Sequence, residues 1–232
     1  MGVVYFRNMH VITGKKDIIE GVNMQSSNMM TLYTTGTCTI NGTGQTGSLA
    51  TTNCSMAKGC SVEGLTDSYG AGFNSLDGGV YAMLWTDKAI RLWFFPRSSI
   101  PESITNGDPD PGSFGVPLTN FEPASPCNLQ QEIKDQKIVF DITFCGDWAT
   151  DDFTDSGCPM SDPRSAVRSC VDCVATNPFK YRKAYWEINS IRIYQNQSDY
   201  TGPSKPSAGT GIVAHLRMLA VVCGVAIMAI EL

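Results

Sequence analysis

Charge is scarce in this 232-residue chain, and positive charge is scarcer than negative charge. Charged residues make up 17% of the sequence, and 17 Lys and Arg against 22 Asp and Glu give a formal net charge of −5. The Lys and Arg residues form no cluster, and the chain has no internal repeat. Because nucleic-acid phosphates bind to basic surfaces, the sequence predicts no nucleic-acid partner.

The first residues lack the features of a leader sequence. Residues 1–13 have no basic start, no long apolar stretch and no small-residue cleavage site, so they do not form a signal peptide. They resemble no segment of a known domain. We therefore treat 1–13 as an unmatched N-terminal segment that precedes the folded domain.

The C-terminal end differs in composition from the rest of the chain. Residues 198–217 are typical of a linker or spacer, and 218–232 form an apolar tail too short to span a bilayer comfortably. Together with the small residues Ser207, Ala208 and Gly209, this order matches a glycolipid-anchor (GPI) signal, so we expect attachment to a membrane or cell wall. The alternative is a frayed tail or a loosely packed helix. In both cases we expect the tail to lie outside the fold.

Cysteine, by contrast, is abundant. One of the nine cysteines, Cys223, lies in the tail, and the even number in the body predicts disulfides and an oxidising compartment. Zinc is the alternative, but only Cys170 and Cys173 have ligand spacing and no second pair completes a site, so we expect neither metal nor cofactor. Glycosylation triplets at Asn41, Asn53 and Asn196 agree with a secreted or cell-surface parent protein. The body cysteines are Cys38, Cys54, Cys60, Cys127, Cys145, Cys158, Cys170 and Cys173.

Gly, Ser, Thr and Asn are frequent, and six segments rich in β-branched or aromatic residues predict strands. One helix is predicted late in the chain, with Asp162 as its N-cap and Pro163 in its first turn, and it ends before Asn177-Pro178. Many strands with one helix indicate a β-sandwich. The predicted strands are 16–21, 30–35, 80–85, 90–95, 137–144 and 186–194, with a hairpin turn at 86–88.

Two carboxylates lie close together in the first of these strands. On a regular strand Asp17 and Glu20 would point to opposite faces, but one bulged residue between them would bring both to the same face as Lys15. Most glycoside hydrolases use a pair of carboxylate side chains for catalysis. An edge strand with solvated charges is the alternative.

Residues 17–23 read Asp-Ile-Ile-Glu-Gly-Val-Asn. This string resembles the active-site strand of glycoside hydrolase family 16, Gly-Glu-Ile-Asp-Ile-Ile-Glu-Gly-Val-Asn, in its fungal endo-1,3(4)-β-glucanase (laminarinase-like) branch. The resemblance continues in order through 30–34 (Met-Thr-Leu-Tyr-Thr), 70–74 (Gly-Ala-Gly-Phe-Asn), 78–83 (Gly-Gly-Val-Tyr-Ala-Met), 93–97 (Trp-Phe-Phe-Pro-Arg), 144–149 (Phe-Cys-Gly-Asp-Trp-Ala) and 185–194.

The resemblance implies an all-β jelly-roll sandwich of the concanavalin A-like kind over 14–197, incomplete at its N-terminus. It implies retaining hydrolysis of β-1,3(4)-glucan, with Glu20 as the acid/base and Asp17 as the supporting carboxylate. The nucleophile position falls on Lys15, which cannot form a glycosyl ester, so we expect no retaining hydrolysis. Tyr33 and Trp148 match sugar-binding positions.

The expected partner is therefore β-glucan, and we expect a monomer. Three alternatives to an impaired enzyme stay open: a non-catalytic glucan-binding module, a structural wall protein, and a defective gene model whose true product carries Glu at position 15. The other tryptophans, Trp85, Trp93 and Trp186, are expected inside the fold. The acidic stretch 147–155 is expected to be a solvated loop, because it lacks the pattern of a calcium loop.

Overall fold

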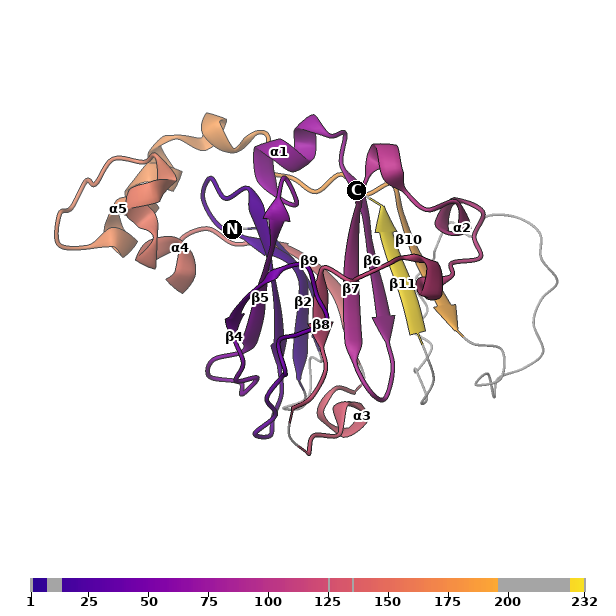
Figure 1. The fold of residues 1–232 in the computed structure, drawn as a ribbon. Coiled ribbons are helices and arrows are strands. Elements are labelled where there is room, and N and C mark those ends of the chain that lie inside the picture. The colour runs from indigo at the N-terminus through magenta and orange to yellow at the C-terminus, as the bar shows by residue number, and fades with distance from the viewer. Residues whose placement is uncertain (1, 8–13, 125, 135, 196–225, 232) are drawn as a thin grey trace.

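Two antiparallel sheets form the body of the protein. The computed structural model describes residues 2–7, 14–124, 126–134, 136–195 and 226–231, and within them the sheets stand face to face (Figure 1). The first sheet has the order β4 (Ser48–Thr51), β5 (Cys60–Thr66), β3 (Ser27–Tyr33), β2 (Lys15–Gly21), β1 (Gly2–Arg7) and β9 (Lys137–Ile142). The second has the order β10 (Ser190–Gln195), β11 (Ala226–Glu231), β6 (Gly79–Trp85), β7 (Ile90–Pro96) and β8 (Thr119–Phe121).

Side chains that alternate along the strands build the core between the sheets. Ile18, Met30 and Leu32 from the first sheet share one buried cluster with Tyr81 and Met83 from the second. The opposite face of β6 is also covered. Val80 and Ala82 there pack in a second cluster with Ile104 and Phe114, which come from the loop-rich region after β7.

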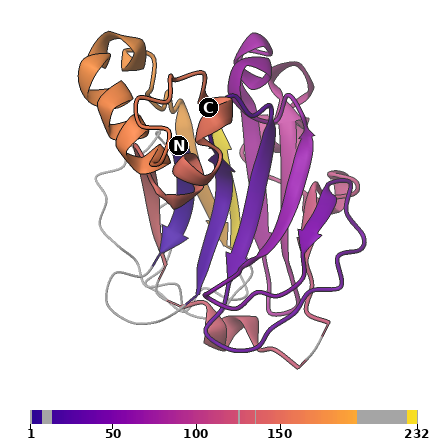
Figure 2. The same cartoon turned by 90° about the vertical axis from the view of Figure 1, so that its left-hand side faces the viewer.

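Short helices lie at both ends of the sandwich. In Figure 1, α1 (Gly70–Ser75) lies at the upper end of the sheets and α3 (Leu129–Glu132) at the lower end. The segment after β9 forms a separate lobe with α4 (Asp147–Asp151) and α5 (Ala166–Thr176), seen again beside β1 and β9 in Figure 2. The remaining short helices are η1 (Arg97–Ser99), α2 (Glu102–Thr105), η2 (Pro111–Ser113), η3 (Phe153–Ser156) and η4 (Pro178–Tyr181).

Four of the predicted strands correspond closely to β2, β6, β7 and β9. The hairpin turn between β6 and β7 is present, closed by the Thr86 amide donating to the Ala89 carbonyl at 3.0 Å. The predicted strand 30–35 is β3, shifted toward the N-terminus, and 186–194 begins as a strand only at Ser190. Strands β4, β5 and β8 were not predicted.

Both chain ends contribute strands, which corrects the sequence analysis. Residues 2–7, within the segment treated as preceding the domain, form β1 between β2 and β9. Residues 226–231, within the tail expected to lie outside the fold, form β11 between β10 and β6. The physical reason is composition. Both segments are runs of β-branched, aromatic or other apolar residues, which are typical of central strands.

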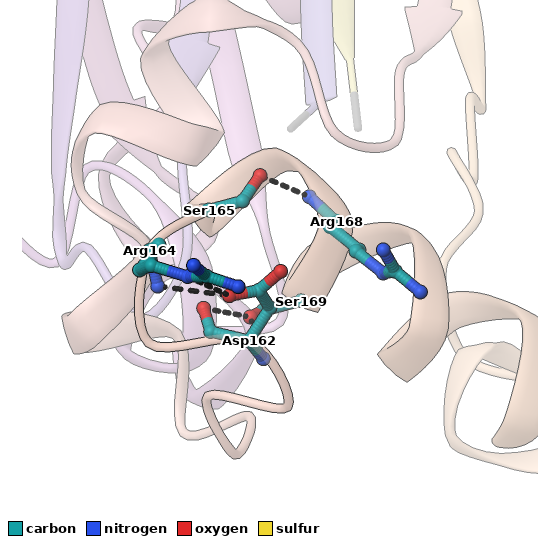
Figure 3. A network of polar contacts seen from close by, with 5 residues as sticks. All are labelled: Asp162, Arg164, Ser165, Arg168 and Ser169. Carbon is teal, nitrogen blue, oxygen red and sulfur yellow. Dashed lines mark hydrogen bonds and ion pairs between the residues drawn. The ribbon is translucent and has the colours of Figure 1, made fainter.

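The helix α5 begins later than predicted. Its N-cap is Ser165, whose hydroxyl accepts the Arg168 amide at 3.2 Å (Figure 3). Asp162 instead turns the chain before the helix. Its carboxylate accepts a hydrogen bond from the Arg164 backbone amide at 3.0 Å. Its backbone amide donates to the Ser169 hydroxyl, and that hydroxyl donates back to the Asp162 carbonyl. The predicted end at Asn177 is confirmed.

The acidic stretch 147–155 is helical rather than a loop, because it forms α4 and the start of η3. Phe153 explains the difference, since its side chain is buried against α5 and draws the stretch into the lobe.

The predicted disulfides are present, and every body cysteine takes part in one: Cys38–Cys127, Cys54–Cys60, Cys145–Cys170 and Cys158–Cys173. The last two attach α5 to the chain around α4, because Cys170 and Cys173 lie one turn apart on the same helix. The zinc alternative is therefore excluded for Cys170 and Cys173.

Candidate functional site

A bulge in β2 shapes the candidate active site. On β1, Val4 pairs with Ile19 while its neighbour Tyr5 pairs with Asp17, so Ile18 has no partner in this register. The extra residue restores Asp17 and Glu20 to one face of the strand. The predicted bulge between the two carboxylates is confirmed.

Asn28 on β3 holds the bulge in place. The ladder between β2 and β3 covers only Lys15 to Asp17. Beyond it, the Asn28 side chain donates to the Ile18 carbonyl at 2.7 Å and accepts the Glu20 amide at 2.8 Å. Asn28 is fully buried, and its backbone amide donates to the Ser68 hydroxyl at 2.8 Å. The sequence analysis missed this residue, because a single Asn in a strand carries no recognisable signal.

Lys15 forms an ion pair with Asp17 inside this site. The Lys15 Nζ lies 2.9 Å from the Asp17 Oδ2, and Asp17 is only 1% exposed. Burial, reinforced by the charge of Glu20, raises the pKa of Asp17 to about 7, although Lys15 acts in the opposite direction. The predicted group of Lys15, Asp17 and Glu20 is thus brought together on one strand.

The pKa of Glu20 is also raised, and burial is the main cause. Lys15 lowers this pKa, as the sequence analysis expected, but the effect of burial is larger. A raised pKa is what an acid catalyst needs, and the acid/base role of Glu20 stays a prediction.

Tyr33 joins the same group. It is the register partner of Lys15 on the neighbouring strand, and the Lys15 Nζ lies 5.2 Å from the centre of its ring. Burial raises the pKa of Tyr33, and the carboxylates of Asp17 and Glu20 raise it further. Its hydroxyl is therefore a neutral hydrogen-bond donor or acceptor, and its role in sugar binding stays a prediction.

Lys16 points to the other side of the strand. It is 2% exposed and its Nζ lies 3.2 Å from the ring centre of Trp85, which belongs to the second sheet. Burial lowers the pKa of Lys16 well below its usual value. A charged residue type thus occupies a core position.

The other predicted residues lie elsewhere. Trp148 is half-buried on α4, and its sugar-binding role stays a prediction. The other tryptophans lie inside as expected, with Trp93 buried and Trp85 and Trp186 partly buried. Asn41 and Asn53 are exposed, whereas Asn196 lies outside the described residues.

The described residues contain no group of three or more His, Cys, Asp or Glu that could hold a metal ion. No helix among them has the length and apolar character needed to cross a membrane.

The family model for the XgeA-like catalytic domain of glycoside hydrolase family 16 matches residues 6–194. The chain belongs to this family. Among its relatives, a probable endo-1,3(4)-β-glucanase of Aspergillus fumigatus is 50% identical over 186 residues, which cover 78% of this chain and 28% of that protein. The endo-1,3(4)-β-glucanase xgeA of Emericella nidulans is 48% identical over 186 residues, with 78% and 29% covered. This family 16 chain therefore spans less than a third of these relatives' length.

Solved structures agree with the family and with the predicted jelly-roll fold. An elongating family 16 β-1,3-glucosyltransferase superimposes with a TM-score of 0.75 at 36% identity, covering 100% of this chain and 66% of that one. Laminarinase 16A from Phanerochaete chrysosporium, described with β-glucans in its donor and acceptor sites, gives 0.71 at 35% identity, covering 80% and 64%.

Proposed function

We propose that this chain binds β-1,3(4)-glucan through the site on β2 but does not hydrolyse it by the retaining mechanism. The ion pair between Lys15 and Asp17 carries the proposal. It places an ammonium group where the resemblance to the family requires a carboxylate nucleophile.

A retaining glycosidase needs a carboxylate that attacks the sugar and a second carboxyl group that first donates and then accepts a proton. Glu20 supplies the second group, with its raised pKa. Lys15 has no carboxylate oxygen to serve as the first group, and its contact with Asp17 also engages the supporting carboxylate. The site keeps its sugar-facing polar groups and loses the covalent step.

Binding is supported by what remains. The carboxyl group of Glu20 and the hydroxyl of Tyr33 are neighbours that can exchange hydrogen bonds with sugar hydroxyls, and the buried carboxyl group of Asp17 lies beside them. The relatives named as endo-1,3(4)-β-glucanases and the laminarinase with bound β-glucans support glucan as the ligand class.

The test measures binding and turnover together. We expect the wild-type chain to be retained by insoluble β-1,3-glucan and to release no reducing ends from linear β-1,3-glucan. We expect Lys15→Glu to gain hydrolysis, because Glu at this position restores the nucleophile, and the double variant Lys15→Glu/Glu20→Gln to lose it again.

Lys15→Gln is the matched control, since it removes the ammonium without supplying a carboxylate, and it should stay inactive. Reducing-end release by the wild-type chain that disappears in Glu20→Gln would contradict the proposal. If neither the wild-type chain nor Lys15→Gln bound insoluble β-1,3-glucan, the proposed glucan binding would be contradicted.

The four disulfides support an oxidising compartment, so we infer that the folded chain is secreted or held at the cell surface. Expression with and without a secretory leader, followed by titration of free thiols, tests this inference. Complete oxidation in the reducing cytosol would contradict it.

A further inference from the structure

A large cavity lies at one end of the sandwich, apart from the carboxylates of β2. Its volume is about 830 Å³, within the range of small-molecule sites. Its walls come from α1 and the turn after it, from the α4–α5 lobe, and from residues 181–189, which meet at the upper end of the sheets (Figures 1 and 2). We call it the end cavity. Ile19 lines it, but Lys15, Asp17, Glu20 and Tyr33 are absent from its lining.

Aromatic rings with fixed orientations form much of its wall. The Tyr69 ring packs so closely on β2 that a Cβ at Gly21 would lie 2.5 Å from it, and the Tyr69 hydroxyl donates to the Gly21 carbonyl at 3.3 Å. The Trp186 indole donates to the Asp141 carbonyl at 3.1 Å. Rings held in this way lose little conformational entropy when a ligand stacks on them.

The opposite wall is fixed covalently. Cys145, Cys158 and Cys170 line the end cavity, and the two disulfides that contain them attach α5 to the rest of the lobe. The cavity is therefore shaped before any ligand arrives, which lowers the cost of binding.

The polar lining is balanced in charge. Its ionisable Asp, Glu, Lys and Arg side chains comprise two of each sign, and Asn74 and Asn189 add amide groups. A balanced set of charges does not select an anion or a cation. Aromatic faces combined with neutral donors and acceptors instead suit a sugar, which has apolar C–H faces and hydroxyl edges. The charged side chains are Asp77, Arg97, Lys183 and Glu187.

We propose that the end cavity is a second carbohydrate-binding site that takes a short, neutral β-glucan segment independently of the site on β2. The choice of glucan rests on the function proposed above. Tyr185, which lines the cavity and is 64% exposed, offers the most accessible ring for stacking.

The experiment titrates the full chain with laminarihexaose by calorimetry. We expect two classes of site in the wild-type chain. Tyr185→Ala should weaken binding at one class of site by up to about tenfold, because the stacking ring is lost. Asn74→Ala should weaken binding at the same class, because a side-chain amide is lost. Both side chains are exposed, so neither change should affect folding, which thermal unfolding checks.

Phe179→Ala is the matched control, because Phe179 is 72% exposed and absent from the cavity lining. Glu20→Gln and Asp17→Asn should weaken only the other class. If Tyr185→Ala and Asn74→Ala leave both classes unchanged, or if Phe179→Ala has the same effect as Tyr185→Ala, the end cavity is not a glucan site. If only the cavity variants weaken binding, the site on β2 is not a glucan site while the end cavity is.

Discussion

Replacement of Lys16 by methionine should stabilise this protein. The change keeps the length of the side chain and replaces a buried amine with an apolar group, in a position where Lys16 is 2% exposed and faces the core. Exchange of buried charged groups for apolar ones of similar volume gains about 1–4 kcal/mol, and the lost contact with Trp85 returns at most about 2 kcal/mol. We expect a net gain of about 2 kcal/mol, which corresponds to a rise in Tm of about 4–8 °C for a chain of this size.

The gain should depend on pH, and its sign follows from the lowered pKa of Lys16. The unfolded chain carries a lysine with a pKa near 10.4, so it binds more protons than the folded chain below that pH. Stability of the wild-type chain therefore falls as pH decreases from about 10 toward the folded pKa. The advantage of Lys16→Met should be largest at neutral or lower pH and should shrink as pH approaches 10.

Urea unfolding at two pH values, about 6 and about 9, measures this effect. The matched control is Lys88→Met, because Lys88 is exposed in the turn between β6 and β7 and should give no comparable gain. If Lys16→Met destabilised the protein, or stabilised it equally at both pH values, the account of a desolvated amine in the core would be wrong.

Asn28→Ala should lower the free energy of unfolding by about 2–4 kcal/mol and weaken glucan binding, because it leaves a buried amide and a buried carbonyl of β2 without their present partner. Normal stability in denaturant titrations together with normal binding in pull-downs would argue against the bulge as the basis of the site. In the wild-type chain, a folded pKa of about 7 for Asp17 makes stability fall as pH rises from about 4 to 7, because the ionised carboxylate is unfavourable in the folded state. Asp17→Asn should flatten this fall, and an unchanged pH profile of Tm would contradict the prediction. Ser165→Ala should lower the free energy of unfolding by about 1 kcal/mol through loss of the cap on α5, measured by chemical denaturation, where no change would show that the cap is dispensable. The double replacement of Cys38 and Cys127 by alanine should lower the unfolding free energy by about 2–5 kcal/mol, because this disulfide joins residues 89 positions apart, and an unaltered urea midpoint would refute that reasoning.

The sequence was sufficient for the family, the jelly-roll fold and the bulge between Asp17 and Glu20. These depend on local patterns that are complete within a few residues, such as the strand-like runs that became β6 and β7. The disulfide state could also be inferred from cysteine number. The pairing could not, because it depends on which loops the fold brings together, as Cys38 and Cys127 illustrate.

Other elements gave weak or misleading local signals. Strand β4 is exposed along its whole length, so it has no apolar alternation to detect. Helix α1 begins Gly-Ala-Gly, which is typical of a loop. Strand β11 lies in an apolar tail whose composition also suits an anchor signal, and only its pairing with β6 and β10 distinguishes the two. Asn28 acts through hydrogen bonds to another strand, which no local pattern reveals.

The role of Asn28 means that the backbone path of β2 and the chemical group at position 15 depend on two different residues. The kink in β2 depends on a side chain from β3, so the chemical identity of position 15 can change without altering the path of the backbone. If the proposed function holds, substitution at position 15 alone separates a chain that hydrolyses glucan from one that only binds it. Reactivity in such folds has to be judged from the atoms at the attacking position, since the scaffold around them is the same in both cases.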